Sequence, residues 1–214
     1  MASNHRIRKG ARVNRSSESI KPRHGCIIMA SGLGKRFGGN KLMADLNGKP
    51  LVQYAIEATS GLFARRVVVT RSDKVAKLCQ ALGVHAVLHT EPKRSDTVRL
   101  GMNKLGNCAT AMFVQGDQPL ISIETIAALL RSAEDDPASI WRTSFHGTPG
   151  APMLFPSWAF DELRALPCGK GGSFVAKAHA EKVRTVEVAS KWELFDVDTR
   201  EDLLSLQQSR LIGE

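Results

Sequence analysis

The segment from residue 29 to residue 41, MASGLGKRFGGNK, combines four glycines with three basic side chains directly after an apolar run. Glycines let the backbone turn its N–H groups toward an anion, and the side chains of Lys and Arg add positive charge. Three cations, Lys35, Arg36 and Lys41, suit a triphosphate better than a monophosphate. The segment therefore predicts an anion-binding loop, and a mobile basic surface loop is the alternative interpretation.

The glycine spacing excludes two common phosphate-binding motifs. The chain contains no G-x-x-x-x-G-K-[ST] segment, which a P-loop requires. Gly32 and Gly34 begin a G-x-G-x-x-G pattern, but Phe37 takes the place of the third glycine. A dinucleotide site also needs an acidic residue at the end of a second strand about 20 residues further on, and none is present there.

Carboxylates follow two later apolar runs. Asp117 comes directly after one such run, in the segment GDQPLIS, where it could bind a metal ion or cap the next helix. Asp196 and Asp198 are two residues apart and would share one face of an extended chain. Thr199 and Asp202 fit the start of a helix, which leaves the pair 196/198 to complete a metal site with Asp117. Mg²⁺ commonly takes one or two carboxylates together with substrate phosphates.

These residues must be positioned by the surrounding elements, which the apolar pattern predicts. Buried strands are expected at 25–30, 65–70, 84–89, 110–115, 139–144, 152–156 and 183–188. Helices are expected between them, opened or capped by Pro50, Asp73, Ser95, Ser122, Ser157 and Thr199. This alternation predicts an α/β fold with a largely parallel sheet, in which ligands bind beyond the carboxyl ends of the strands.

Length and composition favour a single domain in a reducing compartment. The 214 residues are 43% hydrophobic, with no apolar run long enough to cross a membrane, so we expect no membrane association. Four cysteines lie far apart without a C-x-x-C pair, which suits reduced thiols and a cytoplasmic location.

The net charge of +9 is concentrated at one end of the chain. Residues 1–24 contain seven Lys or Arg and one Glu, with no apolar periodicity. We expect a disordered basic extension at 1–24, followed by one domain at 25–214. A nucleic-acid-binding arm is the less favoured interpretation of this extension, so nucleic acid is not an expected partner.

The motifs together resemble a known family. The segment GCIIMASGLGKRFGGNKL resembles the N-terminal signature of the GT-A-like nucleotidyltransferases, roughly L-A-A-G-x-G-x-R-M-G-x-x-K-L. GDQPLIS resembles the magnesium loop of that superfamily, and its DQP form is typical of the molybdenum cofactor cytidylyltransferase branch among the MobA-like NTP transferases. Met29, Ser31 and Phe37 depart from the usual signature residues.

Three further segments resemble the same branch. GTPGAPMLFP at 147–156 is similar to G-x-P-G-H-P-V-L-F, with Ala151 in place of His. GKGG at 169–172 is similar to D-K-G-[AG], with Gly169 in place of Asp, and FDVDTREDL is similar to the ending D-I-D-T-P-E-D-L. The resemblance covers about residues 25–206 and implies a single Rossmann-like, GT-A-type αβα sandwich in three layers with a mixed, largely parallel sheet.

The resemblance also implies a role for individual residues. Nucleotide-binding positions would be Ala30, Ser31, Gly32, Leu33, Gly34, Lys41, Ser95, Thr97 and Arg99, the last three from SDTVRLG, which resembles S-x-S-[IL]-R-x-G. Catalytic positions would be Arg36, Lys41 and Asp117, and the metal ligands would be Asp117 and Asp198. Acceptor-binding positions would be Gly150, Pro152, Lys170 and Gly171.

The implied reaction joins the α-phosphate of CTP to the terminal phosphate of a pterin-type acceptor, molybdopterin or the molybdenum cofactor, and releases pyrophosphate. The metal would be Mg²⁺, with Mn²⁺ as the alternative. MASG is nearer the cytidylyl form L-A-A-G than the guanylyl form L-A-G-G, but Ser31 adds a hydroxyl, so GTP stays open. A different phosphorylated acceptor also stays open, and so does a non-catalytic nucleotide-binding factor that serves a molybdenum hydroxylase or its chaperone.

Overall fold

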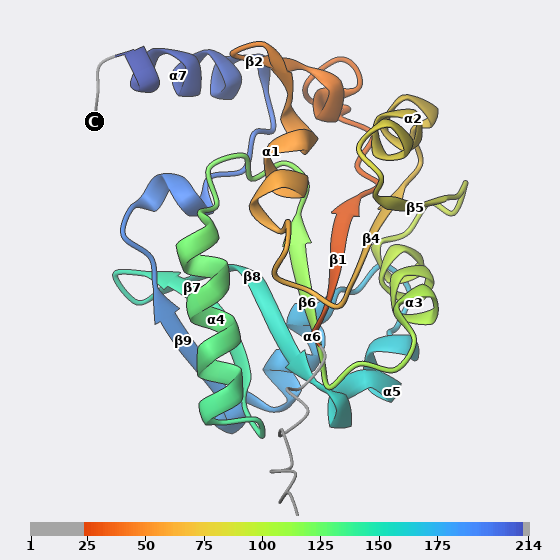
Figure 1. Cartoon of the computed structure of the whole chain (residues 1–214), viewed down its shortest axis with the longest axis vertical. Helices are drawn as coiled ribbons and strands as arrows, with labels where there is room; N and C mark the ends of the chain where they lie inside the picture. Colours follow the sequence, from red (N-terminus) through yellow and green to blue (C-terminus); the bar gives the residue numbers. More distant parts are fainter. Residues whose placement is uncertain (1–23, 212–214) are drawn as a thin grey trace, which may run out of the picture.

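The structure, a computed structural model, describes residues 24–211, with side chains up to residue 208, and it is built around a seven-stranded sheet (Figure 1). The sheet has the strand order β5-β4-β1-β6-β8-β7-β9. Its strands are β1 (His24–Ala30), β4 (Arg65–Thr70), β5 (His85–Leu88), β6 (Thr110–Gln115), β7 (Ile140–Phe145), β8 (Thr148–Pro156) and β9 (Val183–Glu187). A separate two-stranded ribbon joins β2 (Asp45–Leu46) to β3 (Lys49–Pro50).

Most neighbours in the sheet are parallel, and β8 is the exception. β1 pairs in parallel with both β4 and β6, and β4 pairs in parallel with β5. β8 runs antiparallel to β6 and to β7, while β7 and β9 are again parallel. These pairings confirm the predicted mixed, largely parallel sheet. The strands β1, β4 and β6 suit its parallel part, because their apolar runs can be buried on both faces.

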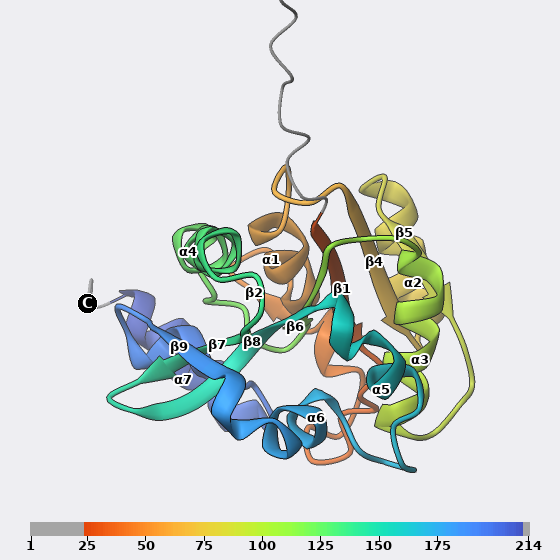
Figure 2. The same cartoon turned by 90° about the horizontal axis from the view of Figure 1, so that it is seen from below.

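Helices cover both faces of the sheet (Figure 2). The described residues contain seven α-helices: α1 (Leu51–Ala58), α2 (Asp73–Ala81), α3 (Arg94–Leu105), α4 (Ile123–Asp135), α5 (Phe160–Arg164), α6 (Gly172–Ala178) and α7 (Arg200–Leu211). Residues of α1, α2 and α4 share one buried cluster with the sheet, and residues of α3, α5 and α6 share the other. The expected three-layer αβα sandwich is therefore confirmed. None of the helices within residues 24–211 has both the length and the apolar character needed to cross a membrane.

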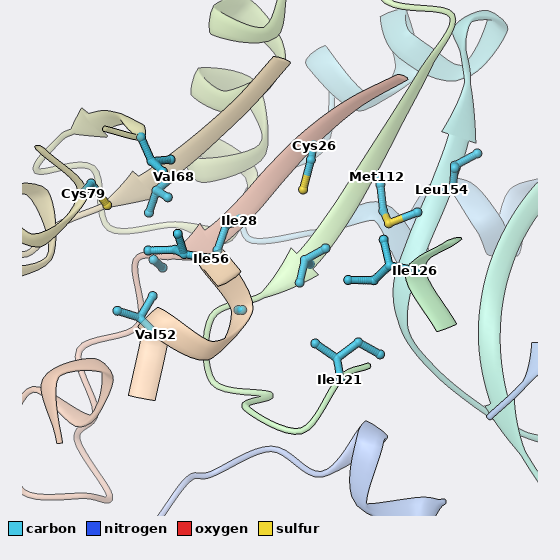
Figure 3. Packing of buried hydrophobic residues seen from close by; sticks show 14 of the residues in the cluster. Cys26, Ile28, Val52, Ile56, Val68, Cys79, Met112, Ile121, Ile126 and Leu154 are labelled. Atoms are coloured by element: carbon cyan, nitrogen blue, oxygen red, sulfur yellow. The ribbon is translucent and has the colours of Figure 1, made fainter. Parts of the chain in front are cut away.

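The larger apolar cluster fills the space between the sheet and the helices α1, α2 and α4. Figure 3 shows Ile28 of β1 beside Ile56 of α1, and Cys26 and Val52 belong to the same cluster. On the opposite face, Phe113 and Phe155 meet edge to face with ring centroids 5.7 Å apart. The candidate site lies at the carboxyl ends of β1 and β6, where ligands bind in open α/β sheets.

Several helix starts differ from the sequence expectation. Ser72 and not Asp73 caps α2, because the Ser72 hydroxyl accepts the N–H of Val75. Ser95 lies inside α3, whose cap position is Lys93. The helix α6 was not predicted, since it begins at a glycine with no polar side chain to cap it.

The predicted basic extension, residues 1–24, lies outside the described residues except for its last member. His24 is the first residue of β1, it is buried, and its Nδ1 lies 2.7 Å from Oγ1 of Thr110. The assignment of His24 to the extension was wrong, because this side chain is held between two strands.

Candidate active site

The glycine-rich loop leaves the end of β1 and is tightly folded. Gly34 has φ +60°, and a Cβ built there would lie 2.2 Å from the carbonyl oxygen of Gly39. The N–H of Gly38 donates to the carbonyl of Gly34 at 3.0 Å, and the N–H of Lys41 donates to Gly39 at 2.9 Å. Only glycine fits position 34, because its neighbour is backbone and cannot move aside.

An apolar cluster attaches this loop to the segment 196–198. Phe37, in the middle of the loop, is buried with Leu46, Leu51, Val197 and Leu206. Val197 stands between the two acidic residues 196 and 198, so its burial fixes the backbone from which their side chains project. In the sequence Phe37 stands out as a departure from two glycine-loop patterns, and its shared burial with Val197 was not predicted.

Lys41 lies at the centre of the site. Its Nζ donates to Oδ2 of Asp117 at 2.6 Å and to Oδ1 of Asp198 at 2.8 Å. The N–H of Val197 also donates to the carbonyl of Asp117 at 3.0 Å, so backbone and side chains join the same two segments. The α4 helix is capped by Ser122, and the carboxylate of Asp117 faces Lys41 instead of capping that helix.

Arg36 completes the charged cluster from the rim. Its guanidinium donates to Oδ2 of Asp198 at 2.7 Å. The side chain of Arg36 is 72% exposed, whereas that of Lys41 is only 7% exposed. Lys41 therefore forms the floor of the site, and Arg36 is free to turn toward a ligand at its mouth.

The ion pairs shift the pKa values of the charged groups. Burial disfavours the Lys41 ammonium, but the contacts with Asp117 and Asp198 outweigh burial and raise the pKa of Lys41 above its ordinary value. The hydrogen bond from Lys41, assisted by Arg36, holds the pKa of Asp198 below its ordinary value. Both groups are therefore fully charged at neutral pH.

Asp196 behaves in the opposite way. Partial burial, assisted by the negative charges of Asp117 and Asp198, raises the pKa of Asp196 from 3.8 to about 6. The Asp196 side chain still opens onto the pocket, so it is crowded by protein atoms without being closed off from water. Three carboxylates thus gather at one place, and only two of them contact Lys41.

The donor set of the site fits a divalent cation that is completed by a ligand. Asp117 and Asp198 already share one cation, the Lys41 ammonium, which occupies a position suited to positive charge. Among residues 24–211 no cluster of three or more His, Cys, Asp or Glu side chains could hold a metal by itself. Two carboxylates plus phosphate oxygens are the ligands that Mg²⁺ typically uses, so the residues present fit that ion when it arrives with a nucleotide.

The predicted nucleotide-binding residues lie in two places. Ala30 ends β1, and Gly32 and Leu33 are exposed on the loop beyond it. The hydroxyl of Ser31 donates to the carbonyl of Val69 at 3.0 Å and lies 2.7 Å from Nε2 of His89, and it is thus already engaged with the protein.

The segment at the start of α3 has a different environment from the glycine loop. The hydroxyl of Ser95 accepts the N–H of Gly169 at 3.1 Å, which attaches the 169–172 loop to α3. Thr97 is buried, and Arg99 is exposed and paired with Asp96 at 3.2 Å. The nucleotide-binding role of Ser95, Thr97 and Arg99 stays a prediction.

A pocket of about 810 Å³ opens beside the carboxylates, between the sheet and α6. Asp117, Asp196 and Asp198 line one part of it. Of the predicted acceptor-binding residues, Gly150 and Gly171 line the pocket as well. Pro152 is buried within β8 and Lys170 is exposed, and neither belongs to the pocket wall.

The pocket also contains basic residues that no sequence motif singles out. Arg94 of α3, Arg142 of β7 and Lys191 belong to its wall. They come from three separate elements, so only folding brings them together. In the sequence, only the positive charge of these side chains could have indicated a binding role, and charge alone did not distinguish them from ordinary surface residues.

A buried glutamate holds the last part of the site against α4. Glu193 belongs to the 3₁₀ helix η4 (Lys191–Leu194), and its Oε2 accepts the hydroxyls of Ser122 and Thr125, each at 2.6 Å. The N–H of Ser122 donates to the same oxygen at 3.1 Å. A carboxylate at a helix N-terminus is favourably placed, and it anchors the segment that leads to Asp196 and Asp198.

The fold and the site define the class of NTP transferase domains. The chain matches the family described as "MobA-like NTP transferase domain" over residues 26–183, and it belongs to that family. A curated relative, the 3-deoxy-manno-octulosonate cytidylyltransferase of Francisella tularensis subsp. holarctica (strain FTNF002-00 / FTA), is 36% identical over 92 residues. That alignment covers 41% of this chain and 37% of the relative. The chain spans between about a third and a half of the length of the curated relatives it matches.

Solved structures share the fold. A nucleotidyl transferase from Methanothermobacter thermautotroptrophicus has a TM-score of 0.76 at 19% identity, covering 90% of this chain and 99% of its own. A CMP:2-keto-3-deoxy-manno-octonic acid synthetase complexed with CTP has a TM-score of 0.73 at 19% identity, covering 90% and 100%. Rv0371C of Mycobacterium tuberculosis H37Rv, in complex with manganese, has a TM-score of 0.66 at 18% identity, covering 87% and 99%.

Proposed function

We propose that this chain is a Mg²⁺-dependent cytidylyltransferase that joins the α-phosphate of CTP to the terminal phosphate of a pterin-type acceptor, molybdopterin or the molybdenum cofactor. The bond formed is a phosphoanhydride, and the bond broken lies between the α- and β-phosphates of CTP, so pyrophosphate leaves. Mn²⁺ is the alternative metal, and GTP is the alternative nucleotide.

One observation carries the proposal: the Lys41 ammonium lies between Asp117 and Asp198 at the end of the glycine loop. Two carboxylates without a counter-cation would repel each other, and Lys41 offsets this repulsion in the nucleotide-free protein. A divalent cation that arrives with a nucleotide would supply the same charge at Asp117 and Asp198, and Lys41 would then be available to the phosphates. The site therefore supports phosphoryl chemistry better than it supports a static anion-binding role.

The residues of the site would each reduce the repulsion between two anionic reactants. A divalent cation held by Asp117 and Asp198 would supply Lewis-acid chemistry at the phosphates. Lys41 and Arg36 would stabilise the negative charge that builds up on the leaving pyrophosphate. A phosphate nucleophile is already ionised at neutral pH, so the reaction needs no general base.

The relatives support the choice of CTP. The curated relative from Francisella is a cytidylyltransferase, and one structural neighbour is complexed with CTP. Another neighbour is in complex with manganese, which supports a divalent metal. The four free cysteines suit a cytoplasmic location.

The acceptor has one specific competitor. The relatives' names favour 3-deoxy-manno-octulosonate, a sugar acid, whereas the DQP segment and the 147–156 segment resemble the molybdenum cofactor branch. Ala151 and Gly169 depart from that branch, and both belong to the half of the chain expected to hold the acceptor. We retain the pterin-type acceptor as first choice and the sugar acid as second.

The experiment measures pyrophosphate release from CTP, GTP, ATP and UTP, with Mg²⁺ or Mn²⁺, and with either molybdopterin or 3-deoxy-manno-octulosonate. We expect release with CTP, a divalent metal and molybdopterin. Faster release with GTP would overturn the base assignment, and release only with the sugar acid would overturn the acceptor.

Thermal unfolding with each nucleotide separates binding from turnover, because a ligand that binds the folded state raises its melting temperature. A shift with CTP and Mg²⁺ but no turnover with any acceptor would support the non-catalytic maturation factor instead. No shift with any nucleotide would remove the whole proposal.

A further inference from the structure

Arg142 is a half-buried cation in the pocket wall that forms no ion pair in the described part of the chain. Its Nε and one terminal nitrogen donate to the carbonyl oxygen of Gly150, at 3.2 Å and 2.9 Å. A carbonyl carries only a partial negative charge, so this contact orients the guanidinium without neutralising it. The remaining N–H groups of the fork are donors for which no carboxylate is provided.

The position of Arg142 is unfavourable for a charge unless an anion joins it. Burial lowers the pKa of Arg142, yet a guanidinium stays protonated at neutral pH. A partly desolvated cation without a partner destabilises the folded protein, and an oxyanion in the pocket would offset that effect through charge-assisted hydrogen bonds. The arrangement is typical of a binding residue that is completed by its ligand.

The sheet register places Arg142 two strands away from β6, the strand that leads to Asp117. Arg142 is opposite Met153 of β8, and Met153 is opposite Phe113 of β6, the strand that leads to Asp117. Two strand spacings therefore separate β7 from β6, which is about 10 Å. Because β8 is antiparallel to β6, Gly150 lies three residues further toward the carboxyl end of β6 than Met153, and the contact with Gly150 brings the guanidinium toward that end.

The charged side chains of the site differ in whether they have an ion-pair partner. The carboxylates of Asp117 and Asp198 are paired with Lys41 and Arg36. In contrast, Arg94 and Lys191 have no ion-pair partner within residues 24–211, and they share the pocket wall with Arg142.

We propose that Arg142 is a specificity-determining residue that binds an oxyanionic group of the acceptor, on a strand two positions away in the sheet from the one that leads to Asp117. This inference rests on the proposed function, because it assigns the acceptor to the same pocket. The selected acceptor is thus an elongated molecule with an oxyanion remote from its reacting end. A carboxylate on a sugar acid and a molybdenum oxyanion on a pterin share this chemistry.

Two probes distinguish these sources by calorimetric titration at constant ionic strength: 3-deoxy-manno-octulosonate and molybdate. We expect the wild-type chain to bind at least one of them. Arg142→Gln keeps an amide donor for the carbonyl of Gly150 but removes the charge, and it should weaken binding by about tenfold or more, the effect of losing one charged hydrogen bond. Arg142→Lys keeps the charge and should weaken binding less.

The matched control is Arg131→Gln, an exposed arginine of α4, which should leave the affinity for both probes unchanged. Wild-type affinity in Arg142→Gln would overturn the proposal, and so would the absence of binding of both probes to the wild type. Thermal unfolding of each variant shows that it is folded, and the Arg142→Lys variant provides the comparison if Arg142→Gln is not.

The rise in melting temperature produced by CTP with Mg²⁺ distinguishes a failure of this inference from a failure of the proposed function. We expect Arg142→Gln to keep the full CTP shift, because the glycine loop is untouched. If the wild type shows no CTP shift, the proposed function fails, while the probe titrations still decide the role of Arg142.

Discussion

At one end of the site Lys41 and Arg36 hold Asp117 and Asp198 in ion pairs, whereas on the hairpin two strands away Arg142 has no carboxylate partner within residues 24–211. The first end is tied together by the glycine loop, by a shared apolar cluster and by backbone contacts. The second end is built on a hairpin and on short helical segments. Paired charges suit the binding of a metal and nucleotide that take over the pairing, while a cation without a partner suits an anionic ligand.

The largest expected effect lies at the end with the paired charges. Asp117→Asn removes a predicted metal ligand and one acceptor for Lys41, so Mg²⁺-dependent pyrophosphate release from CTP should fall by about a thousandfold, the equivalent of several kcal/mol of metal stabilisation. Steady-state release assays measure this, and Asp135→Asn, an exposed residue at the end of α4, is the control. Undiminished turnover in Asp117→Asn would remove the metal role.

The next effect contrasts two glycines of one loop. Gly34→Ala forces a Cβ to 2.2 Å from the carbonyl oxygen of Gly39, so the loop must rearrange and the CTP–Mg²⁺ melting shift should be lost. Gly38 has φ +75° but open space around its Cα, so Gly38→Ala should only destabilise the protein, by about 1 kcal/mol. Equal CTP shifts in the two variants would show that the loop conformation is not what binds the nucleotide.

A smaller effect is expected from the hydrogen bond that attaches the 169–172 loop to α3. Ser95→Ala leaves the N–H of Gly169 without its acceptor and frees the 169–172 loop, which should destabilise the protein by about 1 kcal/mol. We expect the KM for the acceptor to rise severalfold and the KM for CTP to stay constant, with Ser60→Ala, an exposed serine, as control. If the KM for CTP rises instead, Ser95 acts as the nucleotide residue that the sequence predicts.

The smallest effect concerns stability and pH. The folded-state pKa of Asp196 is about 6, above the ordinary 3.8, so the ionised group destabilises the folded protein at neutral pH. Asp196→Asn should therefore stabilise the chain by about 1 kcal/mol at neutral pH, less than the full shift implies because cavity water screens the charge. Asp135→Asn is again the control.

The pH profile gives the sign of this effect. As pH falls through the folded-state pKa, Asp196 becomes protonated, and the gain from Asn should vanish by about pH 4, which is near the unfolded-state value. Thermal unfolding across this range measures the difference as a rise of about 2–4 °C at neutral pH. A gain that persists in acid would show that the Asp196 charge is not responsible.

The fold was largely predictable from the sequence, for a physical reason. The strands β4 and β6 begin and end at the predicted residues, because apolar runs buried on both faces have sharp limits. The strand β8 is longer than predicted, since its first residues, Thr148–Gly150, have a hairpin partner but no apolar pattern. Helix caps were less predictable, as Ser72 and Asp73 compete at adjacent positions.

The sequence predicted those residues of the site that belong to a local motif, and it missed those that only folding brings together. Asp117 follows β6 and Asp198 precedes α7, both within recognisable motifs, and the structure brings both to Lys41. Arg142 and Lys191 lie in β7 and η4 and have no local pattern, so their common pocket exists only in three dimensions. The same holds for Phe37, whose burial depends on residues more than a hundred positions away.

The antiparallel strand β8 has a consequence for how this family could diversify. Phe155, near one end of its nine residues, is part of the core, whereas its other end leads to an exposed turn at His146 and Gly147. Insertions or replacements at that turn would alter acceptor selection while leaving the apolar core and the nucleotide machinery intact. The hairpin is therefore the place where grafting from other members should exchange acceptor preference between scaffolds.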